Sequence, residues 1–227
     1  MTKPMDEIKD RVATVVVTYN RAEMLRQCLM SLQKQTMPCD ILVVDNASTD
    51  NTQALVQRAA QHDASIFYRN TGENLGGAGG FNFGMRWAVE AGYAFVWVMD
   101  DDCFPEPVAL EKLLDADRLL QGEYGWLSSV ALWTDGRECR MNRPKIKKNF
   151  YDRIELLRDG ILLAEQATFV SLFLKAETIR AVGLPVKEFF IWGDDIEYTR
   201  RITIREKMPC YVCLLYTSPS PRDLSTS

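Results

Sequence analysis

The sequence predicts an α/β fold, an open and mostly parallel sheet with helices on both faces. Short β-branched runs alternate with segments of helical periodicity through the first half of the chain. The runs are continuously apolar, as in "VATVVV" at residues 12–17, which is typical of parallel strands buried on both faces. Strands that alternate with helices form βαβ units. At 227 residues, 47% of them hydrophobic, the chain can bury one large core.

The first half carries most of this pattern. Strands are expected at residues 12–17, 41–44, 66–68 and 94–99. Helices are expected between them at residues 22–35, in "NTQALVQRAA" and at residues 81–90. Ligands of open parallel sheets lie beyond the carboxyl ends of the strands. The segments "TYNR", "DNASTD" and "DDD" follow three of these strands and are therefore the candidates for chemistry.

The second half is less regular. Helices are expected at residues 107–120 and 176–182, and strands at residues 126–133 and 167–174. The segment "FFIWGDDIEYTRRI" is expected to be a strand-like run that leads into a helix. Residues 137–148 carry six basic residues against one acidic residue. Such a run is usually a solvated loop, and it can otherwise face lipid headgroups or a diphosphate.

Charge and hydropathy exclude several classes of protein. The net charge of −4 gives no reason to expect nucleic-acid binding. No apolar run approaches the roughly 18 residues that a membrane span needs, and residues 1–11 are polar. We therefore expect a cytoplasmic protein, and peripheral contact with the inner face of the cell membrane stays open.

Cysteine and histidine usage excludes other kinds of site. The six cysteines follow no disulfide framework and are expected to be reduced thiols. Cys210 and Cys213 have C-x-x-C spacing, but no second pair joins them to complete a metal site. His62, the only histidine, is expected on the surface, so no Ser/His or Cys/His catalytic arrangement can depend on it.

The C-terminal segment "CLLYTSPSPRDLSTS" has no helical or strand periodicity and is rich in Ser, Thr and Pro. It closely resembles a translated sequencing adapter, and the alternative is a genuine disordered tail. We therefore divide the chain into a domain at residues 1–212, incomplete at its C-terminus, and a non-native or disordered tail at residues 213–227. Residues 218–227 are expected to lack packing.

Three consecutive carboxylates, Asp100, Asp101 and Asp102, follow the apolar run "FVWVM". Like charges this close repel by about 1 kcal/mol per pair even in water. Side chains alternate along a strand, so Asp100 and Asp102 should point to one side and Asp101 to the other. Two carboxylates on one side can share a hard divalent cation, Mg²⁺ or Mn²⁺. The alternative, an exposed acidic turn that caps the next helix, is less consistent with the preceding buried strand.

The segment "NTGENLGGAGGFNFGM" at residues 70–85 is rich in glycine. Glycines permit positive φ and allow backbone N–H groups to approach a ligand; those concerned are Gly76, Gly77, Gly79 and Gly80. The segment does not match a P-loop, and no G-x-G-x-x-G follows the first strand, so neither a P-loop nucleoside triphosphatase nor a Rossmann dehydrogenase is supported.

The "WGDD" segment permits two interpretations. Asp194 stands three residues before Glu197, the spacing of a capping box, and is expected to be a structural N-cap. Asp195 is then free to face a cleft as a general base; alternatively, both aspartates only cap the helix. The helix dipole favours a charged carboxylate and weakens its basicity, and partial burial would offset this.

Taken together, the segments "VVVTYNR", "VVDNAST", "NLGGAGGFNFGM", "VMDDDC" and "WGDDIEY" resemble glycosyltransferase family 2 in order and approximate spacing. This family has the GT-A fold, and the glycine segment and WGDD are most similar to its bacterial galactofuranosyltransferase and rhamnosyltransferase branches. The resemblance extends from Val12 to about Val212. It implies transfer of a sugar, with inversion, from a nucleotide-sugar donor to a hydroxyl of a glycan or lipid-linked glycan. UDP-galactofuranose and dTDP-rhamnose are the donors it favours.

The resemblance also implies roles for individual residues. Thr18, Tyr19 and Arg21 border the nucleotide, and Asp45 hydrogen-bonds its base. Asn74 with the adjoining Gly76 and Gly77 lies against the ribose, diphosphate or sugar. Asp102, with Asp100, binds the divalent metal (Mn²⁺ or Mg²⁺), while Asp100 or Asp101 contacts the donor. Asp195, beside Asp194, is the catalytic base, and Trp192 helps to form the acceptor pocket. The oligomeric state does not follow from the sequence.

One departure from the family concerns the metal. A histidine beyond the WGDD helix commonly completes the family's metal site, and none follows Val212 here. Weak donor binding or absence of turnover by the chain as given is therefore an alternative to the activity that the resemblance implies. A nucleotide-binding fragment without catalysis is one alternative function. A sugar-1-phosphate nucleotidyltransferase is another, although "TYNRAEM" lacks the glycines of its phosphate loop.

Overall fold

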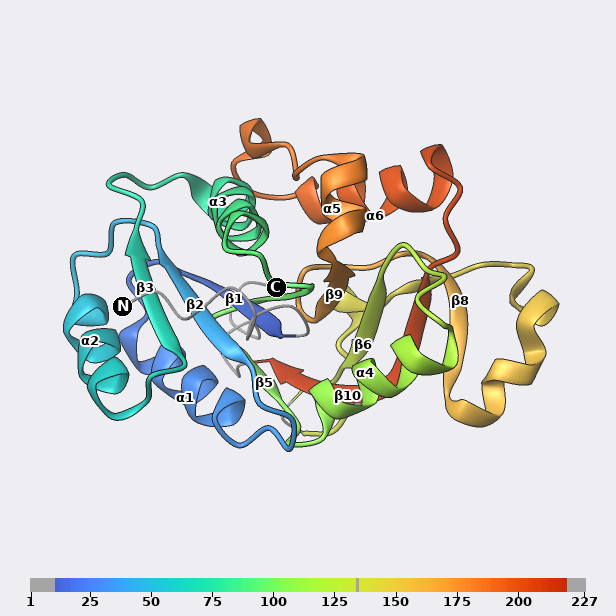
Figure 1. Cartoon of the computed structure of the whole chain (residues 1–227), viewed down its shortest axis with the longest axis horizontal. Helices are drawn as coiled ribbons and strands as arrows, with labels where there is room; N and C mark the ends of the chain where they lie inside the picture. Colours follow the sequence, from blue (N-terminus) through green and yellow to red (C-terminus); the bar gives the residue numbers. More distant parts are fainter. Residues whose placement is uncertain (1–10, 134, 220–227) are drawn as a thin grey trace.

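The computed structural model describes residues 11–133 and 135–219, with side chains up to Leu214. Within these residues, one sheet has the strand order β3-β2-β1-β4-β9-β6-β10-β8-β7, and β5 pairs with β10 (Figure 1). The strands are β1 (Val12–Thr18), β2 (Asp40–Asp45), β3 (Ile66–Asn70), β4 (Phe95–Asp100), β5 (Cys103–Pro105), β6 (Leu127–Ala131), β7 (Lys145–Ile146), β8 (Ile161–Gln166), β9 (Leu172–Lys175) and β10 (Tyr211–Pro219).

The four N-terminal strands β3, β2, β1 and β4 are parallel, as expected for βαβ units. Beyond them β9 runs antiparallel to both β4 and β6, so the second half of the sheet is mixed. The α-helices are α1 (Ala22–Leu32), α2 (Thr52–His62), α3 (Gly76–Glu90), α4 (Ala109–Leu119), α5 (Ala176–Val182) and α6 (Asp194–Arg200). The predicted α/β class, with a mostly parallel sheet, is confirmed.

Helices cover both faces of the sheet. α1, α2 and α4 lie on one face, and α3, α5 and α6 lie on the other (Figure 1). Each face has its own apolar core: Leu25 and Leu110 belong to the first, and Phe81 and Tyr198 belong to the second. Burial of each such side chain stabilises the fold by about 1.5–3 kcal/mol. This two-sided packing leaves the strand ends as the place for a polar site.

The glycine segment differs from the expected loop. α3 begins at Gly76, and only this one of the four glycines has a positive φ, of 70°. The glycines are needed for packing instead. A Cβ on Gly80 would lie 2.5 Å from Val17 Cγ1, and one on Gly84 would lie 2.3 Å from Val15 Cγ1. The small residues therefore allow α3 to approach β1 closely.

The "FFIW" run is not a strand. It continues from the 3₁₀-helix η4 (Lys187–Phe189) into a loop, in which Phe190 and Trp192 have φ values of 59° and 78°. Positive φ at non-glycine residues is incompatible with a β-strand. A strand was also expected at residues 167–174, but β9 begins only at Leu172, and β8 was not expected.

The strand that begins at Tyr211 does not stop at Val212. β10 continues to Pro219 and pairs with β6, β8 and β5. Cys213 is buried. The expectation that residues 213–219 contain no strand is therefore wrong, because pairing partners from three other strands supply what local periodicity does not. The origin of the segment stays a prediction, and residues 220–227 lie outside the described residues.

Two further expectations concern isolated features. Among the described residues, no helix is both long and apolar enough to cross a bilayer. His62 is the last residue of α2 and is exposed, as expected.

Candidate active site

The carboxyl ends of β1, β2 and β4 meet at one edge of the sheet. Thr18 is paired in register with Asp45, and Val17 is paired with Asp100. β1 lies between β2 and β4 in the sheet: β2 and β3 follow on one side of it, and β4 lies on the other side. The carboxyl end of β1 is therefore the topological switch point of the parallel half. The segments singled out after the three strands are therefore neighbours in space.

The acidic triplet does not follow strand alternation. β4 ends at Asp100, so Asp101 and Asp102 lie in the turn that follows. Asp101 accepts a 2.6 Å hydrogen bond from Thr18 Oγ1. Arg21 Nη1 lies 2.9 Å from Asp102 and 3.4 Å from Asp101. The expectation that Asp101 and Asp102 point to opposite sides is therefore wrong, because both contact the same Arg21 nitrogen.

Burial and mutual repulsion dominate the electrostatics of the triplet. Burial, followed by the charges of Asp102 and Asp101, raises the pKa of Asp100 well above its usual range. Burial also raises the pKa of Asp101 to about 6, against the opposing hydrogen bond from Thr18 and the charge of Arg21. Arg21, whose side chain is 50% exposed, is a cation in contact with two of the three carboxylates.

Asp100, at the end of β4, and Asp195, in the first turn of α6, line the same cleft. The cleft has a volume of about 370 Å³. Its lining residues come from α3, β4, the 3₁₀-helix η2 (Arg140–Asn142), the segment before β9, the loop before α6 and the start of α6. They are Gly77, Phe81, Asp100, Met141, Asn142, Thr168, Phe169, Val170, Ile191, Trp192, Gly193, Asp194, Asp195 and Ile196. The structure therefore brings the acidic triplet and the WGDD segment together.

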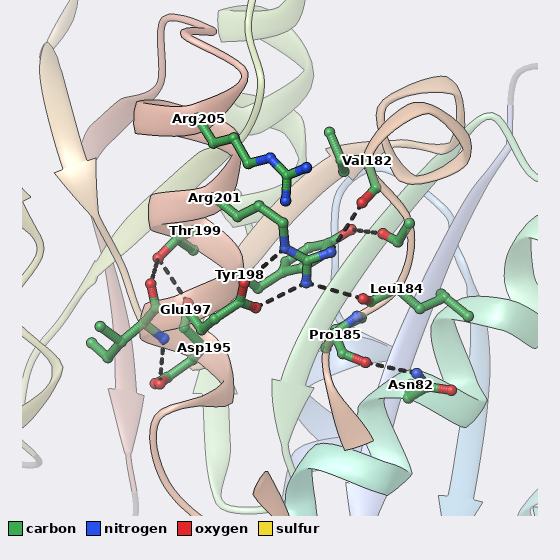
Figure 2. Close-up of polar contacts among 12 residues, drawn as sticks. Asn82, Val182, Leu184, Pro185, Asp195, Glu197, Tyr198, Thr199, Arg201 and Arg205 are labelled. Atoms are coloured by element: carbon green, nitrogen blue, oxygen red, sulfur yellow. Dashed lines mark hydrogen bonds and ion pairs between the residues drawn. The ribbon is translucent and has the colours of Figure 1, made fainter. Parts of the chain in front are cut away.

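Asp194 is not the N-cap of α6. Gly193 occupies that position with a φ of 91°, and no side chain caps the helix. The expected capping box with Glu197 is therefore absent, because the glycine places Asp194 inside the first turn. Asp195 Oδ1 accepts a 2.6 Å hydrogen bond from the backbone N–H of Ile196. Figure 2 shows Asp195 at this end of the helix.

Both carboxyls at the start of α6 are harder to ionise than usual. Burial raises the pKa of Asp195 to about 6, and the hydrogen bond from the Ile196 backbone opposes this rise. Burial raises the pKa of Asp194 as well. The loss of solvation thus outweighs the helix N-terminus, which alone would lower both values. A carboxylate with this pKa is a useful general base near neutral pH.

The nucleotide side of the predicted site is already occupied by protein contacts. Asp45 is fully buried, and it accepts hydrogen bonds from Tyr68 Oη at 2.7 Å and from the Ser48 backbone N–H at 2.8 Å. Asp45 does not line the cleft. Tyr19, on the loop after β1, is 43% exposed. Tyr19 is therefore accessible from solvent, whereas the Asp45 carboxylate is enclosed and hydrogen-bonded within the protein.

Asn74 and Gly76 form the turn that starts α3. Asn74 is exposed, and its Oδ1 accepts a 2.9 Å hydrogen bond from the Gly76 N–H. Gly76 is packed against the loop between η4 and α6, since a Cβ on Gly76 would lie 2.2 Å from Phe190 O. Of the predicted residues Asn74, Gly76 and Gly77, Gly77 lines the cleft, and Asn74 and Gly76 do not.

Exposed apolar side chains surround the mouth of the cleft. Trp192 is 80% exposed and Ile191 is 53% exposed, and both line the cleft. Met141, 58% exposed, joins them from the segment that includes η2 (Arg140–Asn142). Sequence reasoning placed Trp192 here but missed Met141, Asn142 and the residues 168–170. No local pattern marks them, because they come from two segments on either side of β8 in the sequence that only the folded chain brings to the cleft.

No group of three or more His, Cys, Asp or Glu side chains in residues 11–133 and 135–219 has the arrangement of a metal site. The donor set near Asp100 nevertheless suits a hard divalent ion, since it consists of carboxylate oxygens with too little compensating charge.

Several known proteins are similar to this chain in sequence. The sequence profile described as Glycosyl transferase family 2 matches residues 14–119. Galactofuranosyltransferase GlfT1 of Mycolicibacterium smegmatis is 32% identical over 213 residues, which cover 89% of this chain and 68% of that protein. The chain belongs to glycosyl transferase family 2. An undecaprenyl-phosphate mannosyltransferase of Micrococcus luteus is also 32% identical to this family member, over 84% of this chain and 77% of that protein.

Solved structures show the same fold. The mannosyltransferase PcManGT of Pyrobaculum calidifontis, solved with GDP-Man and Mn²⁺, superposes with a TM-score of 0.65 at 21% identity. The superposition covers 92% of this chain, which spans only 56% of that structure. The fold of this family 2 glycosyltransferase is therefore GT-A, as the motifs predicted.

Proposed function

We propose that this protein transfers a sugar from a nucleotide-diphosphate donor to a hydroxyl of a glycan or lipid-linked acceptor, with inversion. The observation that carries the proposal is the cleft shared by Asp100 and Asp195. A donor bound at the strand ends would place its anomeric carbon between the acidic triplet and the start of α6. An acceptor hydroxyl that enters beside Trp192 would then meet Asp195.

In this proposal Asp195 removes the proton from the attacking acceptor hydroxyl. Its raised pKa, about 6, leaves it mostly ionised at neutral pH while it retains basicity. The hydroxyl attacks the anomeric carbon as the bond to the diphosphate breaks, and the departing phosphate retains the bonding electrons. Attack from the face opposite the leaving group inverts the anomeric configuration. Asp194 supports the same wall of the cleft.

A divalent cation suits the proposed site. Asp100 and Asp102 would hold Mn²⁺ or Mg²⁺, and the bound ion would offset the negative charge of the diphosphate leaving group. Arg21, which already pairs with Asp102, adds a fixed positive charge at the same place. Thr18 keeps Asp101 oriented through its 2.6 Å hydrogen bond. Tyr19 and Asp45 would contact the base of the nucleotide.

The donor and acceptor are proposed from the relatives. UDP-galactofuranose is the first donor to test, since GlfT1 is a galactofuranosyltransferase. A mannose donor is the second, because the Micrococcus luteus relative is equally identical and matches over a larger share of its length. dTDP-rhamnose remains a third. The exposed apolar residues at the mouth of the cleft suit an acceptor with a lipid part, presented at a membrane surface.

Incubation with each sugar nucleotide, Mn²⁺ and a polyprenyl-linked acceptor tests the proposal, with labelled product as the readout. The expected result is transfer by the wild type and by Glu90→Gln, an exposed substitution at the far end of α3, but loss of transfer in Asp195→Asn. Nucleotide binding without transfer or donor hydrolysis would indicate a binding fragment instead. Turnover by Asp195→Asn at the wild-type rate would refute the assigned base.

A further inference from the structure

The segment between α5 and η4 is held by an unusual run of side-chain contacts. Four successive backbone carbonyls, those of residues 182–185, each accept a hydrogen bond from a side chain (Figure 2). Carbonyls beyond the end of a helix have no partner within that helix. Here α6, the π-helical turn η5 (Arg201–Arg205) and α3 supply the missing donors.

Arg201 makes the central contacts. Its Nη1 donates to Val182 O at 3.0 Å, and its Nη2 donates to Leu184 O at 3.1 Å. The same guanidinium forms two 2.9 Å bonds with the Glu197 carboxylate, one turn earlier on α6. The Arg201 side chain is only 14% exposed. A planar fork that satisfies two carbonyls and one carboxylate at once fixes the relative position of both segments.

Two neighbouring contacts complete this arrangement. Tyr198 Oη donates to Gly183 O at 3.0 Å, and the Arg201 guanidinium lies 5.0 Å from the centre of the Tyr198 ring. Asn82 of α3 donates to Pro185 O at 2.7 Å. We name Arg201, Glu197, Tyr198 and Asn82, with the carbonyls of residues 182–185, the α5–α6 clamp.

The clamp is connected to the cleft on both sides. α6 carries Asp195 at its first turn, two residues before Glu197 and six before Arg201. On the other side, the segment of residues 182–185 leads through η4 to Phe190, whose carbonyl accepts a 3.1 Å hydrogen bond from the Ala78 N–H of α3. α6 has only seven residues, too short to hold its own position without tertiary contacts.

We infer that Arg201 is a positioning residue for Asp195: through the α5–α6 clamp it sets where the carboxylate lies relative to Asp100 and the cleft. This inference depends on the proposed role of Asp195 as base. The effect is geometric, because Arg201 contacts Glu197 and backbone carbonyls and makes no bond to Asp195. A displacement of about 1 Å in a reacting group can cost about 100-fold in rate.

Lys175 provides a matched control. Its ammonium group likewise bonds a backbone carbonyl, that of Gly122, pairs with Glu177, and lies 5.3 Å from the Tyr124 ring. It is similarly buried, with 18% of its side chain exposed. Lys175 pairs with Phe95 at the start of β4, whereas Asp100 ends that strand, so Lys175→Met breaks a comparable contact away from the cleft.

The test compares Arg201→Met, Arg201→Lys and Lys175→Met in the full chain, at a temperature where all are folded. We expect kcat to fall about 10- to 100-fold in Arg201→Met and less in Arg201→Lys. The dissociation constant for UDP should stay within about twofold of wild type. When Arg201→Met is added to the Asp195→Asn variant, kcat should fall by less than about threefold, because the residue that Arg201 positions is already disabled. Equal loss in Lys175→Met, or additive losses with Asp195→Asn, would overturn the inference.

Hydrogen exchange gives a readout that does not depend on turnover. Amides of residues 193–199 should exchange faster in Arg201→Met than in wild type, while Lys175→Met leaves them unchanged. Unchanged exchange in Arg201→Met would show that the clamp does not hold α6 and would overturn the inference. A wild type without transfer would instead refute the proposed function, and the exchange measurement would then decide on the clamp alone.

Discussion

Replacement of Asp195 by Asn should make the protein more stable and less active at the same time. Asp195 lies partly buried at the start of α6, where burial raises its pKa from 3.8 to about 6. Ionisation of Asp195 at neutral pH is therefore less favourable in the folded state than in the unfolded state. Asparagine has nearly the same shape and no charge, and its side-chain oxygen can still accept the 2.6 Å bond from the Ile196 N–H.

The size of the effect follows from the pKa. A rise of about two pH units corresponds to about 3 kcal/mol, which is an upper limit for the stabilisation because the side chain keeps some contact with water. We expect Asp195→Asn to raise the free energy of unfolding by about 1–3 kcal/mol at pH 7.5. For a domain of this size that is a rise in Tm of about 2–10 °C.

The pH dependence has a definite sign. Below about pH 4 the carboxyl is protonated in both states, so wild type and variant should be equally stable. As the pH rises from about 4 to about 6, the unfolded carboxyl loses its proton first, and the wild type loses stability that the variant keeps. The advantage of Asp195→Asn should therefore grow across this window and stay constant above it.

Urea unfolding at pH 4.5, 6 and 7.5 measures this difference, and single-turnover transfer at the same pH values measures activity. Transfer by the wild type should rise with pH through about 6, and Asp195→Asn should lose about 10²- to 10⁴-fold. An Asn variant that is less stable than wild type at pH 7.5, or a stability difference that does not change with pH, would refute the reasoning from burial.

Three further predictions concern packing, metal and acceptor. Gly84→Ala should destabilise the fold by about 1–3 kcal/mol, because its Cβ would lie 2.3 Å from Val15 Cγ1. Gly77→Ala is the control and should not lower Tm, because its Cβ would have no atom within 4 Å. Equal melting temperatures of the two variants would contradict this prediction. Mn²⁺ with UDP should raise the Tm of wild type, by an amount equivalent to about 2.7 kcal/mol at 100 times the dissociation constant, with reversal by EDTA and loss in Asp100→Asn. An equal metal response in Asp100→Asn would exclude that ligand. Trp192→Ala should raise the acceptor KM several-fold and leave Tm unchanged, since the side chain is 80% exposed; an unchanged KM would remove Trp192 from the acceptor site.

The sequence by itself determined the parallel half of the fold and the order of its motifs. β1, β2 and β4 are short, mostly apolar and buried runs, which is the pattern of parallel strands covered on both faces. β3 is only partly buried, and its place after a helical segment is what predicts it. Because ligands of such sheets lie at the strand ends, Thr18, Asp45 and Asp100 could be predicted to share one edge without coordinates.

Only the tertiary structure decided the conformation of the segments between these points. Glycines are compatible with a loop or a helix, and here they lie in α3, where Gly80 and Gly84 leave no room for a Cβ beside Val17 and Val15 of β1. The apolar run before WGDD fits a strand equally well as a sequence, but contacts with α3 hold it in a loop. Likewise, Arg21 lies between Asp101 and Asp102, and Arg201 reaches carbonyls almost twenty residues earlier, through contacts that no local pattern encodes. Local periodicity reports which side chains prefer to be buried, whereas these choices depend on which partners the folded chain brings within reach.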